Sequence, residues 1–179
     1  MAEGHRLKAG FTGADHVGLT VPNLEQAVAW FQRVLGAEPV AWTAPFGDAG
    51  DLMVRRFKTH PRATVKVCIM RCGMGSNIEL LEWTAPEQKR QMPQTCDHGA
   101  AHVAFHVEDI HAAVRHLRAE GVEVLDEPMH IADGDLAGLW WVYFLTPWGN
   151  FMELYHYPQG MGYEARGGVR MWSPTRPAA

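Results

Sequence analysis

The sequence predicts an α+β fold in which one strand, one helix and three further strands occur in that order twice. Residues 16–21 and 102–107 each begin with a histidine and alternate between apolar and other residues, which is typical of half-buried strands. Each is followed by a segment with apolar residues at helical spacing, which a glycine closes at Gly36 or Gly121. The repeat predicts two similar halves within one chain of 179 residues.

The first half contains the clearer set of elements. Asn23 is a suitable N-cap for its helix. Residues 52–58 fit either a strand or a single helical turn, and the glycines in 73–76 predict a turn between two strands. The expected elements are a strand at 14–21, a helix at 23–35 and strands at 38–43, 64–71 and 77–83.

The second half repeats this order more compactly. Its helix follows Asp109, and its expected strands after that helix lie at 122–125, 139–146 and 151–157. Proline-rich and polar stretches separate and flank the halves. We therefore divide the chain into an N-terminal arm (1–13), a first module (14–83), a linker (84–98), a second module (99–157) and a C-terminal tail (158–179). We expect the tail to wrap the surface or to reach another subunit.

The composition argues against several classes of function. Basic residues are scattered along a chain of net charge −4, so we expect no nucleic-acid partner. The chain has no apolar run of signal-peptide length at its start and none near the roughly 20 residues of a membrane span. We expect a cytoplasmic protein that acts on a small molecule. Cys68, Cys72 and Cys96 lack zinc-type spacing and are expected to be reduced.

Four residues at matching positions of the two halves could carry chemistry. Alternation places His16 and Glu79 of the first half, and His102 and Glu153 of the second, on the strand faces opposite the apolar residues. Taken singly, such residues are more often packed histidines or solvent-facing carboxylates. Their repetition favours metal ligands, and two imidazoles with two carboxylates suit a divalent ion such as Ni, Co, Zn, Mn or Fe.

These residues resemble the vicinal oxygen chelate superfamily, which includes glyoxalase I, methylmalonyl-CoA epimerase, extradiol dioxygenases and the bleomycin- and fosfomycin-resistance proteins. The resemblance implies paired βαβββ modules that form an open, incomplete β-barrel around one metal, and it implies a homodimer. Whether the modules pair within one chain or between chains stays open. The segments that carry it are 15–19, 23–36, 78–80, 101–105 and 146–154, the last with Thr146 where the family has Asp.

The ligand set resembles that of bacterial-type glyoxalase I, which uses His, Glu, His and Glu in this order. The resemblance implies an isomerase or lyase of the glyoxalase or epimerase type, with Glu153 as the first choice of base and Glu79 as the second. Thr20 and Trp83 stand where glyoxalase I has its glutathione-binding Arg and Asn. Glutathione is therefore not the expected co-substrate.

The predicted metal-facing surface also contains aromatic and imidazole side chains. Trp83, Tyr143 and Tyr155 suggest an apolar or aromatic substrate, and core or dimer packing explains them equally well. His106 is a further candidate for substrate contact, although a packed or ligand-supporting imidazole is the more common role for such a histidine.

Two other functions fit the same residues. The first is an Fe(II)-dependent ring-cleaving dioxygenase that uses His102, Glu153 and a further histidine such as His16, and leaves Glu79 unbound. The second is a ligand-binding protein of the bleomycin-resistance type, which would sequester an aromatic compound without converting it. The intact set of four ligands favours an enzyme over this binding role.

Overall fold

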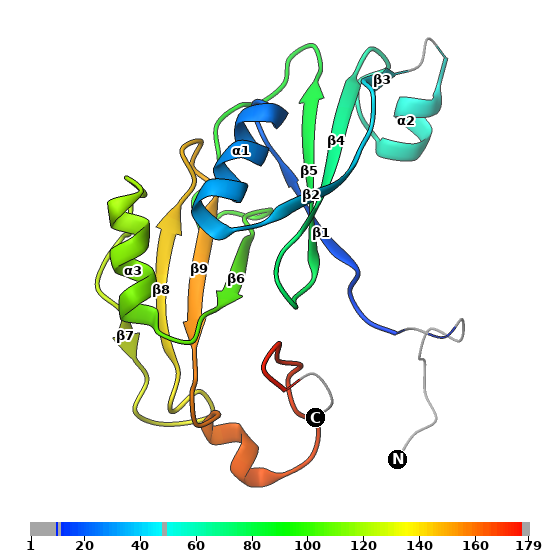
Figure 1. Cartoon of the computed structure of the whole chain (residues 1–179). Helices are drawn as coiled ribbons and strands as arrows, with labels where there is room; N and C mark the ends of the chain where they lie inside the picture. The colour runs from blue at the N-terminus through cyan, green and yellow to red at the C-terminus, as the bar shows by residue number, and fades with distance from the viewer. Residues whose placement is uncertain (1–9, 11, 48–49, 177–179) are drawn as a thin grey trace.

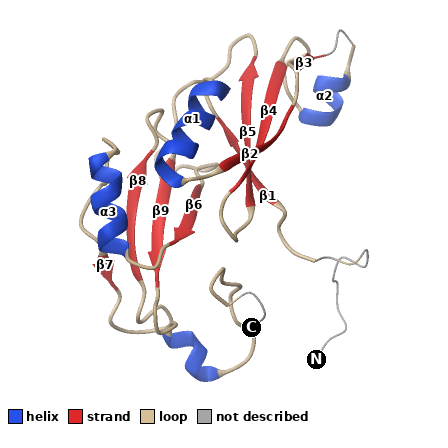
Figure 2. Cartoon of the chain, in the orientation of Figure 1, coloured by secondary structure: helices blue, strands red, loops and turns tan. Residues whose placement is uncertain are grey.

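The computed structural model describes residues 10, 12–47 and 50–176, which form two sheets with helices packed on them (Figures 1 and 2). Most of the expected N-terminal arm, residues 1–9 and 11, lies outside the described residues. The first sheet has the strand order β1-β5-β4-β2, and β3 pairs with β4. Its elements are β1 (His16–Thr20), α1 (Leu24–Leu35), β2 (Glu38–Trp42), β3 (Phe46–Gly47), α2 (Leu52–Phe57), β4 (Thr64–Arg71) and β5 (Asn77–Thr84).

The second sheet repeats this topology with the order β6-β9-β8-β7. In both sheets the first strand runs parallel to the last, and the last pairs antiparallel with the strand before it. The α+β fold with two repeated modules is therefore confirmed. The elements are β6 (His102–His106), α3 (Ile110–Ala119), β7 (Met129–His130), β8 (Trp140–Leu145), β9 (Phe151–His156) and the 3₁₀ helix η1 (Gly162–Arg166).

Several segments differ from the sequence-based expectation or resolve it, and the short strands β3 and β7 were not predicted. Residues 52–58, which fitted a strand or a helical turn, form α2. Residues 122–125 do not form a regular strand, because only Val124 makes an isolated bridge to Phe144 of β8. The chain turns away just after this bridge, where the Asp126 carboxylate accepts a hydrogen bond from the Glu127 backbone N–H at 2.8 Å.

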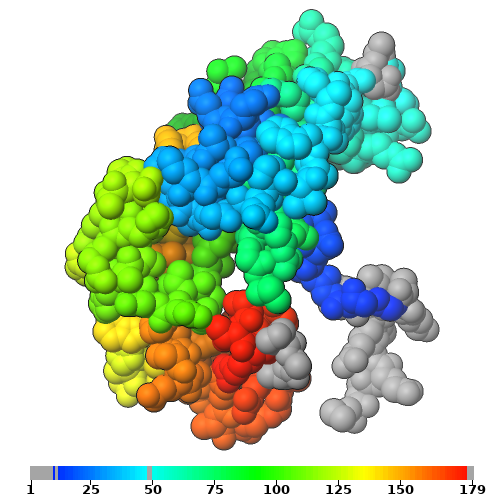
Figure 3. All heavy atoms as spheres, viewed as in Figure 1, coloured from blue at the N-terminus to red at the C-terminus, as the bar shows by residue number. Residues whose placement is uncertain are grey.

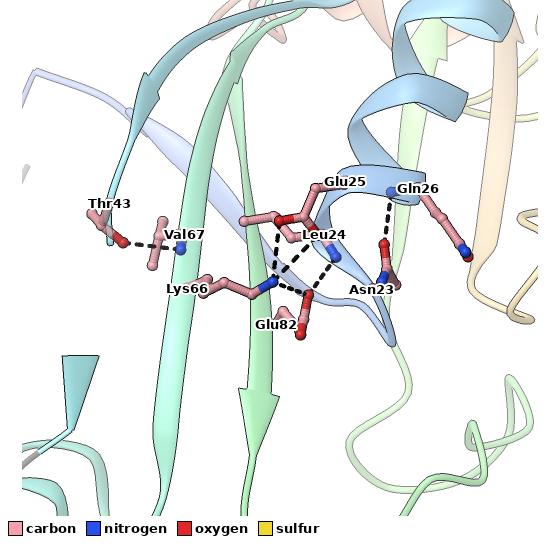
Figure 4. Close-up of polar contacts among 8 residues, drawn as sticks. All are labelled: Asn23, Leu24, Glu25, Gln26, Thr43, Lys66, Val67 and Glu82. Carbon is pink, nitrogen blue, oxygen red and sulfur yellow. Dashed lines mark hydrogen bonds and ion pairs between the residues drawn. The ribbon is translucent and has the colours of Figure 1, made fainter. Parts of the chain in front are cut away.

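Both ends of α1 are fixed by specific groups. The Asn23 side chain accepts a hydrogen bond from the backbone N–H of Gln26 at 2.8 Å, and the Glu82 carboxylate on β5 accepts one from that of Leu24 at 2.7 Å (Figure 4). The helix ends at Gly36, whose φ of 65° is the left-handed conformation that glycine adopts without strain. The N-terminus of α1 is thus attached directly to β5, a strand that also carries part of the candidate site.

The main hydrophobic core extends across both halves and joins them. The ring of Trp30 on α1 lies 5.7 Å from that of Trp148, between centroids, and His116 on α3 contacts the backbone oxygen of Val34 at 2.9 Å. Phe31 is fully buried in this core. No helix in the described ranges is long and apolar enough to cross a membrane. Contacts of α1 with the β8–β9 turn and with α3 therefore join the two modules.

Candidate active site

The first His–Glu pair lies on the face of the first sheet that points away from α1. Leu19 and Leu80 are buried in the core on the α1 side. A Cβ placed on Gly18 would lie 3.4 Å from Glu79 Oε2, so the alternate positions of β1 share the face of Glu79. On this face His16 Nε2 lies 3.6 Å from Glu79 Oε2. Sequence alternation thus places the two side chains together.

Asp15 orients the imidazole of His16. The Nδ1 of His16 lies 2.9 Å from Asp15 Oδ1, so a protonated Nδ1 donates to the carboxylate and Nε2 is left facing Glu79. This hydrogen bond is the main reason that the pKa of His16 is raised; slight burial opposes the shift, and the charge of Glu79 adds to it. A carboxylate behind a histidine is the usual support for a metal-binding imidazole.

The second pair is closer and more buried. His102 Nε2 lies 3.2 Å from Glu153 Oε2, and Glu153 is 7% exposed. Burial raises the pKa of the Glu153 carboxyl, while His102 opposes the shift through its charge and its hydrogen bond. Tyr143 lies on the neighbouring strand, in register with Glu153, with its ring 5.2 Å from that of His102. Burial likewise raises the pKa of Tyr143.

Each pair has the chemistry and spacing of two metal ligands. Donor atoms bound to one divalent ion at about 2.1 Å stand roughly 3.0–3.4 Å apart, close to the separations in both pairs. The two pairs do not converge: among the described residues, no three His, Cys, Asp or Glu side chains are grouped so that they could hold an ion. The structure therefore brings the four predicted ligands together in two pairs, and the two pairs lie apart from each other.

The second pair lines a cavity of about 690 Å³, which we call the His102 cavity. Its volume is in the range of small-molecule sites. His106 and Tyr155 also line it, whereas His16 and Glu79 lie outside its lining. The β4–β5 turn and the C-terminal tail border the cavity; they adjoin in Figure 3, where the tail is red and the turn green.

His106 and Trp83 occupy different environments. The His106 ring packs against Tyr157 with centroids 4.9 Å apart, and the pKa of His106 is lowered, chiefly by burial. Trp83 packs on Phe57 at 5.4 Å and lines a separate cavity of about 490 Å³, together with Thr20. Trp83 shares the sheet face of Glu79 by strand alternation. The structure thus divides the predicted substrate residues between two places.

Three aromatic residues of the His102 cavity, namely Phe105, Tyr157 and Trp172, were not among the sequence-based candidates. Tyr157 continues the alternation of Glu153 and Tyr155 past the end of β9, so the pattern could have identified it. Trp172 comes from the tail, which has no periodic pattern, and only the folded chain places it there.

Comparison with known proteins identifies the family. The family model described as Glyoxalase/Bleomycin resistance protein/Dioxygenase superfamily matches residues 15–144. A 2-epi-5-epi-valiolone epimerase from an Actinomyces species is 45% identical over 166 residues, which are 92% of this chain and 90% of that relative.

Solved structures with lower identity share the fold. A glyoxalase family protein from Bacillus cereus has a TM-score of 0.62 at 21% identity and covers 85% of this chain and 98% of its own. The fosfomycin resistance protein FosX from Listeria monocytogenes has a TM-score of 0.54 at 18% identity, with 86% and 98% covered. The chain therefore belongs to the glyoxalase/bleomycin resistance protein/dioxygenase superfamily, the vicinal oxygen chelate proteins that its motifs resemble.

Proposed function

We propose that this protein is a metal-dependent epimerase that moves a proton on a hydroxylated cyclic ketone of the valiolone type. The observation that carries the proposal is the repeated His–Glu pair, with His16 facing Glu79 and His102 facing Glu153. The identity of 45% to a 2-epi-5-epi-valiolone epimerase supports the substrate class. Proton transfer beside a carbonyl is a reaction that such ligands suit.

The four side chains would hold one ion of Ni, Co, Zn, Mn or Fe through two imidazole nitrogens and two carboxylates. When bound, the ion supplies a Lewis acid for the ketone oxygen, which makes the neighbouring C–H bond more acidic. His16 and His102 would bind the ion as neutral donors, and the Asp15 carboxylate leaves the Nε2 of His16 free for it.

Glu153 is the proposed base. Its carboxylate accepts the proton from the carbon beside the ketone, and the electron pair of that C–H bond moves onto the ketone oxygen. Inversion requires a proton to return to the opposite face of the same carbon. Glu79, which holds the equivalent position in the first module, is the proposed donor: it would leave the ion when substrate binds, take a proton from water and pass it to the carbon. Glu153 afterwards returns its proton to water, so atoms and charge balance over the cycle.

We further propose that the complete ligand set forms between two copies of the chain. The support is the separation of the two pairs, since the described residues of one chain offer only two donors at each place. In the described part of the chain, β1 and β6 are each the last strand of their sheet, and each carries the histidine of a pair. Exposed strand edges are ready surfaces for a second copy.

Mixing two inactive variants tests this arrangement. We expect Glu79→Gln and Glu153→Gln to be inactive alone and to regain about a quarter of wild-type activity after unfolding and refolding together, because half of the dimers are mixed and each has one intact site. The control is a mixture of the two variants refolded separately, in which no subunits are exchanged between dimers. No recovery on co-refolding, with dimers formed, would show that each site belongs to one chain.

Turnover in deuterated water tests the chemistry itself. Incubation with 2-epi-5-epi-valiolone should give the epimer with one deuterium on the inverted carbon, measured by NMR, and a chelator should abolish the conversion. Oxygen uptake dependent on ferrous iron would instead support the ring-cleaving dioxygenase. Binding without conversion, in protein with stoichiometric metal, would contradict the epimerase proposal.

A further inference from the structure

The C-terminal tail, residues 158–176, is folded on itself by one nearly buried carboxylate. Glu164 on η1 accepts hydrogen bonds from both terminal nitrogens of Arg176 at 3.0 Å and from the backbone N–H of Met161 at 3.0 Å. Its side chain is 13% exposed, and Arg176 is the main reason that its pKa falls to about 2. Paired charge-assisted bonds of this kind fix orientation as well as contact.

Glycines allow the tail to approach the module closely. A Cβ on Gly162 would collide with the backbone oxygen of Gly134, and one on Gly138 would lie 2.8 Å from the backbone oxygen of Gly160. The Arg166 guanidinium pairs with Asp135 in the same 134–138 loop, with one N–O distance of 2.9 Å. The start of the tail is therefore fitted to this loop and defines where the rest of the tail can lie.

The end of the tail reaches the His102 cavity. Tyr163 on η1 accepts a hydrogen bond from the backbone N–H of Met171 at 2.9 Å, and Ser173 is 1% exposed. Between these anchors Trp172 is 53% exposed, yet it lines the cavity that also contains His102 and Glu153. An indole held over a cavity and open to solvent is available to a ligand.

We propose that Trp172 is a substrate-binding residue. Its indole packs against the ring of the hydroxylated ketone, and the oxygens of the ketone face His102 and Glu153. This inference rests on the proposed function. Tyr155 and Tyr157 also line the cavity, so its lining is divided between aromatic rings and the polar pair. A hydroxylated ring has the same division, because its C–H groups suit an aromatic face and its oxygens suit polar groups.

Three variants test the role of Trp172 in the full chain. We expect Trp172→Ala to raise KM for 2-epi-5-epi-valiolone about tenfold and to change kcat less than about twofold, since the indole contributes to binding in ground and transition states alike. Trp172→Phe should recover most of the affinity, because it keeps an aromatic face. Val169→Ala is the matched control: Val169 is 96% exposed in the same tail and lies outside the cavity lining.

A binding measurement separates this inference from the proposed function. Calorimetric titration of chelator-treated protein with the same ketone should show weaker binding for Trp172→Ala than for Val169→Ala, at equal thermal unfolding midpoints. Equal KM and equal affinity in these two variants, with wild-type turnover intact, would overturn the role of Trp172 alone. If the wild-type protein neither binds nor converts the ketone, the proposed function and this inference are both overturned.

Discussion

The carboxylate of Glu153 reaches the imidazole of His102 diagonally across two parallel strands, because the residue in register with Glu153 is the small Ala104. The first module has the same relationship, with Gly18 in register with Glu79. A small side chain at this position leaves the space through which each glutamate leans back toward its histidine. The short distance in each pair thus depends on a third residue that binds nothing itself.

Enlarging this position should separate the second pair. We expect Ala104→Leu to weaken divalent-metal affinity by about tenfold or more, because the added side chain occupies the space between Glu153 and His102. Metal titration of chelator-treated protein measures the change. Ala101→Leu, just before β6 and on an exposed position, is the control. Unchanged affinity in a folded Ala104→Leu protein would show that the pair does not act as a ligand pair.

Removing the proposed base should affect turnover far more than folding. We expect Glu153→Gln to lower kcat/KM by about 10²–10⁴-fold, the usual contribution of a positioned proton-transfer group. Steady-state kinetics and metal analysis of the same sample measure this. Glu38→Gln, an exposed carboxylate on β2, should behave as wild type. Full activity in a Glu153→Gln protein that retains its metal would exclude Glu153 as the base.

Asp15 should act on the metal through His16. We expect Asp15→Asn to weaken metal binding by about 10–100-fold, as is typical when the carboxylate behind a histidine ligand is lost. In metal-free protein, the same change should lower the pKa of His16, since the Asp15 hydrogen bond is the largest cause of its upward shift. An NMR titration of the imidazole measures that shift. An unchanged pKa would contradict the Asp15–His16 contact.

The attachment of α1 to β5 should make Glu82 more important for stability than its neighbour Glu25. Glu82 Oε2 accepts from the Leu24 backbone N–H and pairs with Lys66 at 2.9 Å, whereas Glu25 pairs with Lys66 at 3.2 Å and hydrogen-bonds to its own backbone (Figure 4). Glu82→Ala should therefore cost about 1–3 kcal/mol, because it leaves the helix N-terminus without its acceptor. Urea unfolding measures the loss, and Glu25→Ala should show little change.

The Glu164–Arg176 contact should make the stability of the folded tail depend on pH. The pKa of Glu164 falls from its ordinary value of 4.5 to about 2 in the folded chain, mainly because of Arg176. A depressed carboxyl pKa stabilises the fold above the ordinary value, and this contribution is lost as the pH falls toward the folded value. The stability difference between wild type and Glu164→Gln should thus be constant above pH 4.5 and shrink below it. A difference that grows on acidification would contradict the pairing.

The sequence by itself determined the repeat, the two strand faces and the local His–Glu pairs. The two-residue period of a strand puts each histidine and glutamate on the face opposite the apolar residues. The equivalent positions in the two halves then indicate that His16 belongs with Glu79 and His102 with Glu153, and the parallel pairing of β1 with β5 and of β6 with β9 brings them together. The period also predicts which side chains meet the helices. Residues 122–125 show where this pattern stops being informative. A short apolar segment predicts a strand, but here only Val124 makes an isolated bridge.

Only the tertiary structure decided how the two modules are placed and what encloses the His102 cavity. The main core, which includes the contact between Trp30 and Trp148, joins the two modules, and their His–Glu pairs lie apart. Strand alternation carries no information on that placement. The tail residue Trp172 reaches the cavity through the contacts of Glu164 and Arg176. Such contacts join residues that have no periodic relation in the sequence, so they are fixed only when the chain is folded.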